Sequence, residues 1–347
     1  MTAIRWDQVE EPQAQQTLFD EPVFERQPGR GEFRGIEFLH VRARRILNEV
    51  KGAPFGFRWT INAYRGCSHA CTYCFARPTH AHLDLDTDGD FERKIVVKVN
   101  AVGQLRRELD PRRWTGDLIA LGTNTDPYQR AEGKYRLTRG IVEVLTEAAN
   151  PFSILTKSTL VLRDLDLLAE AARRTPVRVN LSIGTLDEEV WRTTEPGTPH
   201  PARRVRAVEA LNAAGVPCGV LIAPVLPGLS DGPEQLDAVV RACVEAGARS
   251  VSTVLLHLRP GVKEVFTRHL AETHPHLVAD NRRRYRDRAY APQADQRELA
   301  TVVSRLVQRY GGTPAERDDP EHMSGPAAVT EVQVRPAGGD QTQLSLL

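Results

Sequence analysis

Three cysteines in one short run constrain this chain more than any other feature. Cys67, Cys71 and Cys74 are separated by three and then by two residues. This spacing lets one loop supply three corners of a 4Fe-4S cubane and leaves the fourth iron without a protein ligand. The other two of the five cysteines, Cys218 and Cys243, lie far downstream and are predicted to be ordinary core thiols. The run therefore predicts an iron-sulfur site with one open iron.

Two other uses of clustered cysteines fit the sequence less well. A structural zinc site needs four nitrogen or sulfur ligands, and the nearby His69, His80 and His82 do not complete a usual spacing. A disulfide cluster needs an oxidising compartment, whereas the first residues are polar and acidic rather than an apolar signal. Five cysteines in 347 residues are sparse, as in a reducing cytoplasm. We therefore expect a cytoplasmic protein.

The length, hydropathy and charge of the chain exclude other classes. No apolar run approaches the roughly 20 residues that cross a bilayer, so no membrane partner is expected. A net charge of +1 does not indicate a strongly basic nucleic-acid binder. Five arginines between residues 282 and 288 form a local basic cluster. That cluster is either a solvated helix face or a surface that contacts phosphates.

Short apolar runs alternate with amphipathic helical patterns and predict an α/β fold. Strands are expected at 59–64, 117–122, 152–156, 177–183, 219–223 and 250–256, and helices at 137–149, 163–174, 202–214 and 235–246. Gly215 and Gly247 close the last two of these helices as left-handed caps. We expect an open (β/α)6 partial TIM barrel with N- and C-terminal extensions. A closed barrel and a doubly wound sheet remain alternatives, because a sequence does not show strand order.

The same patterns divide the chain. We expect a disordered tail at 1–32, an N-terminal extension at 33–58, the barrel core at 59–270, a C-terminal helical extension at 271–311 and a second disordered tail at 312–347. The basic, amphipathic stretch 93–99 is predicted to be an edge strand protected by lysine. The chemistry is expected in loops that follow the strands of the core.

Polar residues follow five of the expected strands. Thr123, Asn124, Thr125 and Asp126 come after the second strand; Lys157 and Ser158 come after the third; Ser182 ends the fourth; Pro224 follows the fifth; His257 and Arg259 follow the sixth. A single one, such as Asp126 or Ser158, is commonly a helix cap. Together they predict a polar mouth that suits a zwitterionic ligand carrying a ribose.

The chain resembles the radical SAM superfamily, and within it the spore photoproduct lyase-related, DNA repair photolyase-like group and an uncharacterised actinobacterial branch. The resemblance covers roughly residues 33–310. It is carried by the cysteine run with Phe75-Ala76-Arg77, by 122–129 (GTNTDPYQ), 154–158 (ILTKS) and 224–228 (PVLPG), and by Glu195-Pro196 with the following Arg203-Arg204.

This resemblance implies a 4Fe-4S cluster on Cys67, Cys71 and Cys74 and S-adenosyl-L-methionine as cofactors. It places Tyr73 beside the adenine and Thr123, Asn124 and Thr125 at the methionine amino group. It assigns Lys157 and Ser158 to the cofactor carboxylate or ribose, and Ser182 to the ribose. The implied activity is reductive cleavage of S-adenosylmethionine to a 5'-deoxyadenosyl radical, which abstracts hydrogen from a substrate.

The substrate is less constrained than the cofactors. Spore photoproduct lyase repairs a thymine dimer in DNA, so nucleic acid is the leading substrate class and a lyase-like reaction is expected. That enzyme needs a cysteine as hydrogen donor at the end of its second strand, where this chain has Thr123 or Asn124. The departure counts against the same reaction, and no catalytic residue is assigned. The alternative function is a non-catalytic iron-sulfur or zinc protein with a structural or sensing role.

Three kinds of partner are expected. A reductant such as flavodoxin or ferredoxin would supply the electron, and DNA would be the substrate. Two terminal peptides resemble the short motifs with which bacterial repair proteins bind the sliding clamp. They are 15–19 (QQTLF) and 343–347 (QLSLL). Chance matches of five residues are common, so packing of these leucines on the domain is the competing interpretation.

Overall fold

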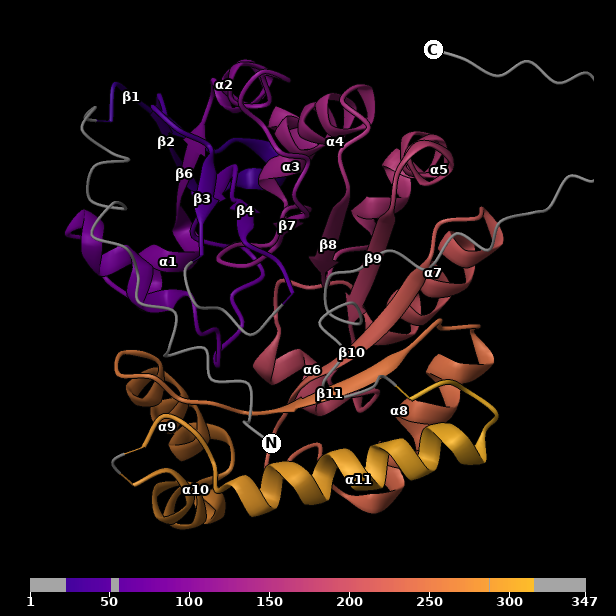
Figure 1. The fold of residues 1–347 in the computed structure, drawn as a ribbon. Coiled ribbons are helices and arrows are strands. Elements are labelled where there is room, and N and C mark those ends of the chain that lie inside the picture. Colours follow the sequence, from indigo (N-terminus) through magenta and orange to yellow (C-terminus); the bar gives the residue numbers. More distant parts are fainter. Residues whose placement is uncertain (1–22, 51–55, 287, 315–347) are drawn as a thin grey trace, which may run out of the picture.

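A curved sheet of parallel strands, covered on its outer face by helices, forms the body of the protein (Figure 1). The computed structural model describes residues 23–50, 56–286 and 288–314. The six parallel strands follow one another in chain order: β4 (Trp59–Ile61), β7 (Ile119–Leu121), β8 (Phe152–Thr156), β9 (Val177–Ser182), β10 (Cys218–Val225) and β11 (Val251–Leu255). β3 (Leu47–Glu49) adds an antiparallel edge to β4. Because β3 and β11 are the two edges, the expected open (β/α)6 partial barrel is confirmed, and the closed and doubly wound alternatives are wrong.

Helices fill the connections between these strands. The longer ones that cover the sheet are α2 (Ala101–Glu108), α4 (Leu137–Glu147), α5 (Leu165–Arg174), α7 (Pro201–Ala213) and α8 (Pro233–Glu245), and short α3 (Ala131–Tyr135) and α6 (Glu188–Thr194) lie in loops. α4 buries Leu137, Ile141, Val144 and Leu145, which share one face at helical spacing. Gly215 and Gly247 follow α7 and α8 with φ of 79° and 75°, as predicted for left-handed caps.

The strands present alternate side chains to two environments. On β9, Val179 and Leu181 are fully buried in the hydrophobic core, whereas Asn180 and Ser182 line a cavity on the inner face of the barrel. This alternation follows from the two-residue repeat of a strand. The inner face is therefore the one on which the polar strand residues gather.

A second, four-stranded sheet corrects three expectations. It contains β1 (Glu25–Pro28), β2 (Glu37–Val41), β6 (Lys94–Lys98) and β5 (Tyr64–Arg65) in that order. β1 lies in the segment that was expected to be disordered. β6 is not an edge strand, because β2 and β5 pair with its two sides. The strand expected at 59–64 is divided between β4 of the large sheet and β5 of the small one.

Burial on both faces explains the error at β6. Its consecutive residues Ile95, Val96 and Val97 are all buried, and Lys98 is only 4% exposed. Burial, with the nearby charge of Arg65, lowers the pKa of Lys98 to about 7. A run that is buried on both sides loses the alternation by which a half-exposed strand is recognised.

Beyond β11 the chain forms α9 (Val262–Thr273), α10 (Val278–Tyr285) and α11 (Gln293–Arg309). α11 packs on β11 and α8 through Leu299, Val303 and Val307 (Figure 1). The remaining short helices are α1 (Gly89–Arg93), η3 (Gly31–Phe33), η4 (Arg77–Leu83), η5 (Thr159–Asp164) and η6 (Pro275–Leu277). None of the helices in the described ranges is both long and apolar enough to span a membrane.

We predict that Gly122→Ala destabilises the protein by about 2 kcal/mol or more. Gly122 directly follows β7 with φ of 95°, and an added Cβ would lie 2.1 Å from the Leu155 carbonyl oxygen of β8. Gly103, inside α2, has open space around an added Cβ. The control Gly103→Ala should therefore raise stability by about 0.5–1 kcal/mol. Urea unfolding of both variants measures the contrast, and a Gly122→Ala protein as stable as the wild type would contradict the close approach of these strand ends.

Candidate functional site

A cavity of about 200 Å³ opens where the carboxyl ends of the parallel strands converge. Its walls carry the three cysteine thiols and polar groups from the ends of β7, β8 and β9. Parallel strands bring their carboxyl ends to one edge of the sheet, so loops far apart in sequence meet there. The sequence-predicted residues on the wall are Cys67, Cys71, Tyr73, Cys74, Thr123, Asn124, Thr125, Asp126, Lys157, Ser182, Pro224 and His257.

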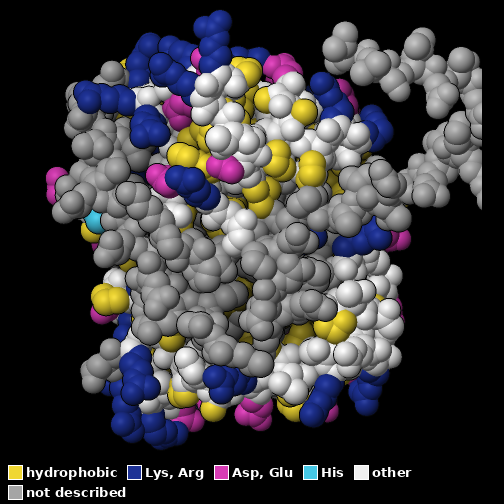
Figure 2. Space-filling view, in the orientation of Figure 1, with side chains coloured by type: hydrophobic (Ala, Val, Ile, Leu, Met, Phe, Trp, Pro, Cys, Tyr) yellow, Lys and Arg dark blue, Asp and Glu magenta, His cyan; other side chains and the backbone are white. Residues whose placement is uncertain are grey.

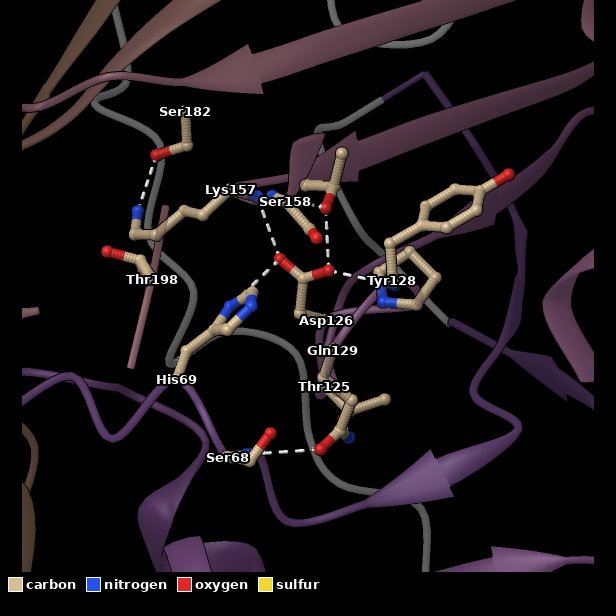
Figure 3. Close-up of polar contacts among 12 residues, drawn as sticks. Ser68, His69, Thr125, Asp126, Tyr128, Gln129, Lys157, Ser158, Ser182 and Thr198 are labelled. Carbon is tan, nitrogen blue, oxygen red and sulfur yellow. Dashed lines mark hydrogen bonds and ion pairs between the residues drawn. The ribbon is translucent and has the colours of Figure 1, made fainter. Parts of the chain in front are cut away.

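The loop with the cysteines begins at a fixed point, the carbonyl of Gly66. That carbonyl accepts hydrogen bonds from Thr125 Oγ1 at 2.7 Å and from Gln129 Nε2 at 2.9 Å. Gln129 also bonds Thr125 Oγ1, and its Oε1 accepts the Ser68 N–H at 3.1 Å. Gln129 is fully buried. These contacts tie the loop after β5 to the loop after β7, and Figure 3 shows Gln129 beside Ser68 and Thr125.

Arg77 holds the backbone of the cysteine loop at Cys71. Its Nε donates to the Cys71 carbonyl at 3.1 Å, and Nη1 donates to the carbonyls of Thr87 and Asp88 at 3.2 and 2.9 Å. Nη2 donates to the Glu92 carboxylate at 3.1 Å. The side chain is 1% exposed. A buried guanidinium with four acceptors fixes the loop backbone, so Arg77 positions the thiols without lining the cavity.

The loop also meets the end of α6. The Gly197 N–H donates to the His69 carbonyl at 3.0 Å, and the Thr72 N–H donates to the Thr194 carbonyl at 3.0 Å. A Cβ on Gly197 would lie 2.1 Å from the Ser68 carbonyl oxygen. Any larger residue would collide with this oxygen, which explains why the run Glu195-Pro196-Gly197 ends in glycine.

None of the five cysteines in the described chain forms a disulfide. Burial raises the pKa of the Cys67 and Cys74 thiols and raises that of Cys71 to about 12. The negative charge of Asp126 adds to the rise at Cys67, and that of Glu195 adds to the rise at Cys71. These thiols are therefore protonated at neutral pH unless a cation takes the place of the protons.

The Tyr73 hydroxyl belongs to an ionic network that is centred on the buried carboxylate of Glu195. The Tyr73 hydroxyl donates to Glu195 Oε1, and Arg204 Nη2 donates to Glu195 Oε2 at 2.5 Å. Lys157 Nζ lies 3.7 Å from Glu195 Oε1. Burial alone would raise the pKa of the Glu195 carboxyl, but the charges of Arg204 and Lys157 and the bond from Tyr73 lower it to about 2. Glu195 is thus ionised, and the two cations leave the network with one net positive charge.

Lys157 is the member of this network that reaches the cavity wall. Its Nζ donates to Ser182 Oγ at 2.5 Å and to the Ala223 carbonyl at 3.0 Å (Figure 3). Ser182 Oγ donates to the same carbonyl at 2.7 Å. Nζ also lies 5.8 Å from the centroid of the Tyr73 ring. Three adjacent strand ends therefore place an ammonium and a hydroxyl side by side.

Asp126 connects three segments at the rim. Its carboxylate accepts hydrogen bonds from Thr156 Oγ1 at 2.6 Å, the Lys157 N–H at 2.8 Å and the Tyr128 N–H at 2.9 Å. His69 Nδ1 of the cysteine loop lies 3.3 Å from the same group (Figure 3). Burial opposes ionisation of Asp126, but His69 and these donors lower its pKa. Asp126 is thus a buried connector and not the helix cap that its sequence position suggests.

Two predicted contacts need correction. Ser158 is not on the cavity wall; its Oγ accepts the Leu160 N–H at 3.2 Å and caps η5. Thr125 does line the cavity, but its hydroxyl donates to Gly66 and accepts from Gln129. Thr123 and Asn124 also lie on the wall, and Asn62 holds the turn that they form. Asn62 Nδ2 donates to Thr123 Oγ1 at 3.2 Å, and Asn62 Oδ1 accepts the Asn124 N–H at 3.1 Å.

Sequence reasoning did not give roles to Glu195, Arg204 or Gln129, although all three stand in the quoted motifs. Their partners lie far along the chain: Glu195 is 122 residues from Tyr73, and Gln129 is 63 residues from Gly66. The only available signal was the occurrence of charged and amide residues within the motifs. Asn180 and Ser252, which line the inner face, carried no signal beyond their place in expected strands.

The comparisons with known proteins agree with this site. Residues 61–240 match the Radical SAM superfamily. An uncharacterised protein of Mycobacterium tuberculosis is 45% identical over 303 residues, which are 87% of this chain and 88% of that protein. An uncharacterised protein of Methanocaldococcus jannaschii is 31% identical over 196 residues, 56% of this chain and 70% of that one. The chain belongs to the radical SAM superfamily. It is an enzyme, and the non-catalytic alternative loses its support.

Solved structures show the same architecture. A spore photoproduct lyase variant with bound AdoMet and dinucleoside spore photoproduct matches with a TM-score of 0.58 at 18% identity, over 83% of this chain and 85% of that chain. Spore photoproduct lyase complexed with dinucleoside spore photoproduct gives 0.54 at 16% identity, over 80% and 81%. The expected resemblance to this group is confirmed at the level of the fold.

We predict that Glu195→Gln costs about 3 kcal/mol of unfolding free energy at neutral pH, because it leaves Arg204 buried without its counter-charge. The pKa of Glu195 lies below its ordinary value of 4.5, so its stabilisation is present above that pH and is lost as the pH falls towards about 2. The difference between variant and wild type should shrink over that window in urea unfolding. The control Glu188→Gln alters an exposed carboxylate on α6 and should change stability by less than about 0.5 kcal/mol. A constant difference at all pH values would refute the ionised state of Glu195.

Proposed function

We propose that this enzyme holds a 4Fe-4S cluster on Cys67, Cys71 and Cys74 and uses it with S-adenosyl-L-methionine to start hydrogen abstraction from nucleic acid. The observation that carries the proposal is that Cys67, Cys71 and Cys74 line one cavity together with the paired Lys157 and Ser182. Thiolates suit iron, whereas an ammonium and a hydroxyl suit a carboxylate and a ribose.

The donor set fits a cluster. The three thiols face a common cavity, yet within the described ranges no three His, Cys, Asp or Glu side chains are placed to share a single metal ion. Three cysteines on one wall supply the number of protein ligands that a cubane with one open iron needs. Loading with iron would replace the three protons that burial keeps on the thiols, so assembly should release protons.

The cavity also fits a zwitterionic cofactor. Lys157 carries the uncompensated positive charge of the Glu195 network to the wall, where a carboxylate would balance it. Ser182, Asn124 and Asn180 add neutral donors and acceptors on the wall. When bound, the two groups supply reductive cleavage of the cofactor C5'–S bond, which gives methionine and a 5'-deoxyadenosyl radical. The protein contributes binding, orientation and exclusion of water.

Nucleic acid is proposed as the substrate class because spore photoproduct lyase, which shares the fold, is known with a dinucleoside photoproduct. A lyase-like reaction follows from the same analogy. Thr123 and Asn124 stand where that enzyme is expected to have its cysteine donor, so the product-forming hydrogen would come from another source.

The partners follow from the proposed chemistry. We propose a cytoplasmic location and a flavodoxin or ferredoxin as the electron source. Docking on the sliding clamp through 15–19 or 343–347 is also a proposal, and both peptides lie outside the described residues.

Removing a thiol should prevent cluster assembly. In Cys71→Ala only two ligands remain, so iron and sulfide bound after anaerobic reconstitution should fall to a small fraction of the wild-type content. Cys243→Ala, which alters a fully buried thiol on α8, should keep the full content. A complete cluster in the Cys71→Ala protein would overturn the assignment of the ligands.

Ser182→Ala should weaken S-adenosylmethionine binding by about 1–2 kcal/mol, because one hydrogen bond to a buried ligand is lost. Ser158→Ala is the matched control, since its hydroxyl caps η5 outside the cavity, and its affinity should be unchanged. Thr125→Val should instead lower the cluster content, because Thr125 holds the Gly66 carbonyl. Titration calorimetry and iron analysis separate these effects. Loss of affinity in Ser158→Ala with none in Ser182→Ala would place the cofactor elsewhere.

Isotope transfer tests the substrate class. Perdeuterated DNA, with and without ultraviolet irradiation, is supplied to the reduced enzyme beside perdeuterated RNA. Abstraction from DNA should place deuterium in the 5'-deoxyadenosine that is formed, which mass spectrometry detects. Label from RNA, or unlabelled product with every polymer, contradicts DNA as the substrate.

A further inference from the structure

Seven exposed arginines gather on the outer side of the molecule, away from the cavity. This arginine face consists of Arg42, Arg44, Arg45, Arg106, Arg107, Arg112 and Arg113. Figure 2 shows Lys and Arg side chains crowded at the edge of the molecule where Figure 1 places α2 and β1. None of the seven lines the cavity. The near-zero net charge of the chain therefore conceals a strongly positive surface.

Contacts between α2 and the segment before β3 assemble this face. The Asn100 side chain exchanges two hydrogen bonds with the Ala43 backbone, at 2.8 and 2.9 Å. Gln104 Nε2 donates to the Arg44 carbonyl at 2.7 Å. Glu108 accepts two further backbone N–H groups of the same segment at 2.8 and 2.9 Å. The segment thus runs along α2, and arginines from both elements share one surface.

Nearby carboxylates leave most of this charge in place. Glu108 is occupied by backbone N–H groups, and Asp110 accepts the Arg112 N–H at 3.0 Å. Glu147 of α4 pairs with Arg106. Set against the seven arginines, these three carboxylates leave a formal excess of positive charge among the described residues. This excess suits an anionic partner.

We propose that the arginine face binds the phosphate backbone of double-stranded DNA. Arginine is suited to this task because its planar guanidinium donates two parallel hydrogen bonds to phosphate. A single-stranded polymer would call for several aromatic rings on which bases stack, whereas the face is built mainly of guanidinium groups. The half-exposed ring of Phe24 borders the face, and its centroid lies 5.7 Å from the Arg42 guanidinium. The choice of DNA as the polyanion rests on the proposed function. Binding at this face would anchor the polymer while the cavity acts on it.

The test compares two triple variants with equal changes in net charge. Arg45→Glu, Arg107→Glu and Arg112→Glu reverse the face. Arg241→Glu, Arg249→Glu and Arg305→Glu reverse exposed arginines elsewhere, on and beside α8 and on α11. Binding of the full-length, cluster-loaded proteins to a fluorescent 30-base-pair duplex (about three helical turns) is measured by anisotropy at several salt concentrations. A third variant with glutamine at the three face positions removes charge without reversing it.

The face variant should lose at least about 10-fold in affinity, and the slope of log affinity against log salt should fall by about 3. The control should lose less than about 3-fold. Formation of 5'-deoxyadenosine without DNA should be the same in all variants, so failure of the proposed chemistry is seen separately. Equal losses in both glutamate variants, unchanged binding in the glutamine variant, stronger wild-type binding to duplex RNA, or binding of flavodoxin in place of DNA would each overturn the proposal.

Discussion

The hydrogen bonds at the Gly66 carbonyl determine where the cysteine thiols lie. Thr125 and Gln129, both from the loop after β7, hold this carbonyl, and Gln129 also fixes the Ser68 N–H. Because Gln129 is fully buried, every one of these bonds replaces water, and losing one leaves a polar group unpaired. The loop between β5 and η4 has no regular structure of its own, so its shape depends on groups supplied by a neighbouring strand end.

The charged group on the cavity wall is likewise held in place by residues that do not line the cavity. Glu195 and Arg204 are almost completely buried and do not line the cavity, yet Glu195 lies 3.7 Å from the Nζ of Lys157, which does line it. A buried pair of this kind contributes little net stability over an apolar pair, so its value lies in placing a defined charge. Tyr73 joins the network through its hydroxyl, which links the cysteine loop to the charge that faces a ligand.

The spacing of apolar residues predicted the barrel, because the strands and the helices of an α/β core place apolar residues at different intervals. The strand at 152–156 matches its prediction at both ends, and α4, α5, α7 and α8 begin within two residues of theirs. The small sheet escaped because β5 has only two residues and because β6, although expected as a strand, is an interior strand and not an edge. In the site, cysteine spacing and strand-end polarity identified the three cysteines and several of the polar residues on the wall. Ser158 lies off the wall and caps η5, which its sequence position does not distinguish from a ligand-binding serine. The support from Gln129 and Glu195 depends on contacts between distant residues.

Cleavage of S-adenosylmethionine by the reduced protein tests the central claim most directly. The full-length chain is reconstituted with iron and sulfide without oxygen, reduced, and incubated with S-adenosylmethionine, and 5'-deoxyadenosine is quantified by chromatography. We predict that the wild type forms 5'-deoxyadenosine and that the Cys71→Ala protein forms none. A wild-type protein that carries a full cluster, binds S-adenosylmethionine and yields no 5'-deoxyadenosine would contradict the account.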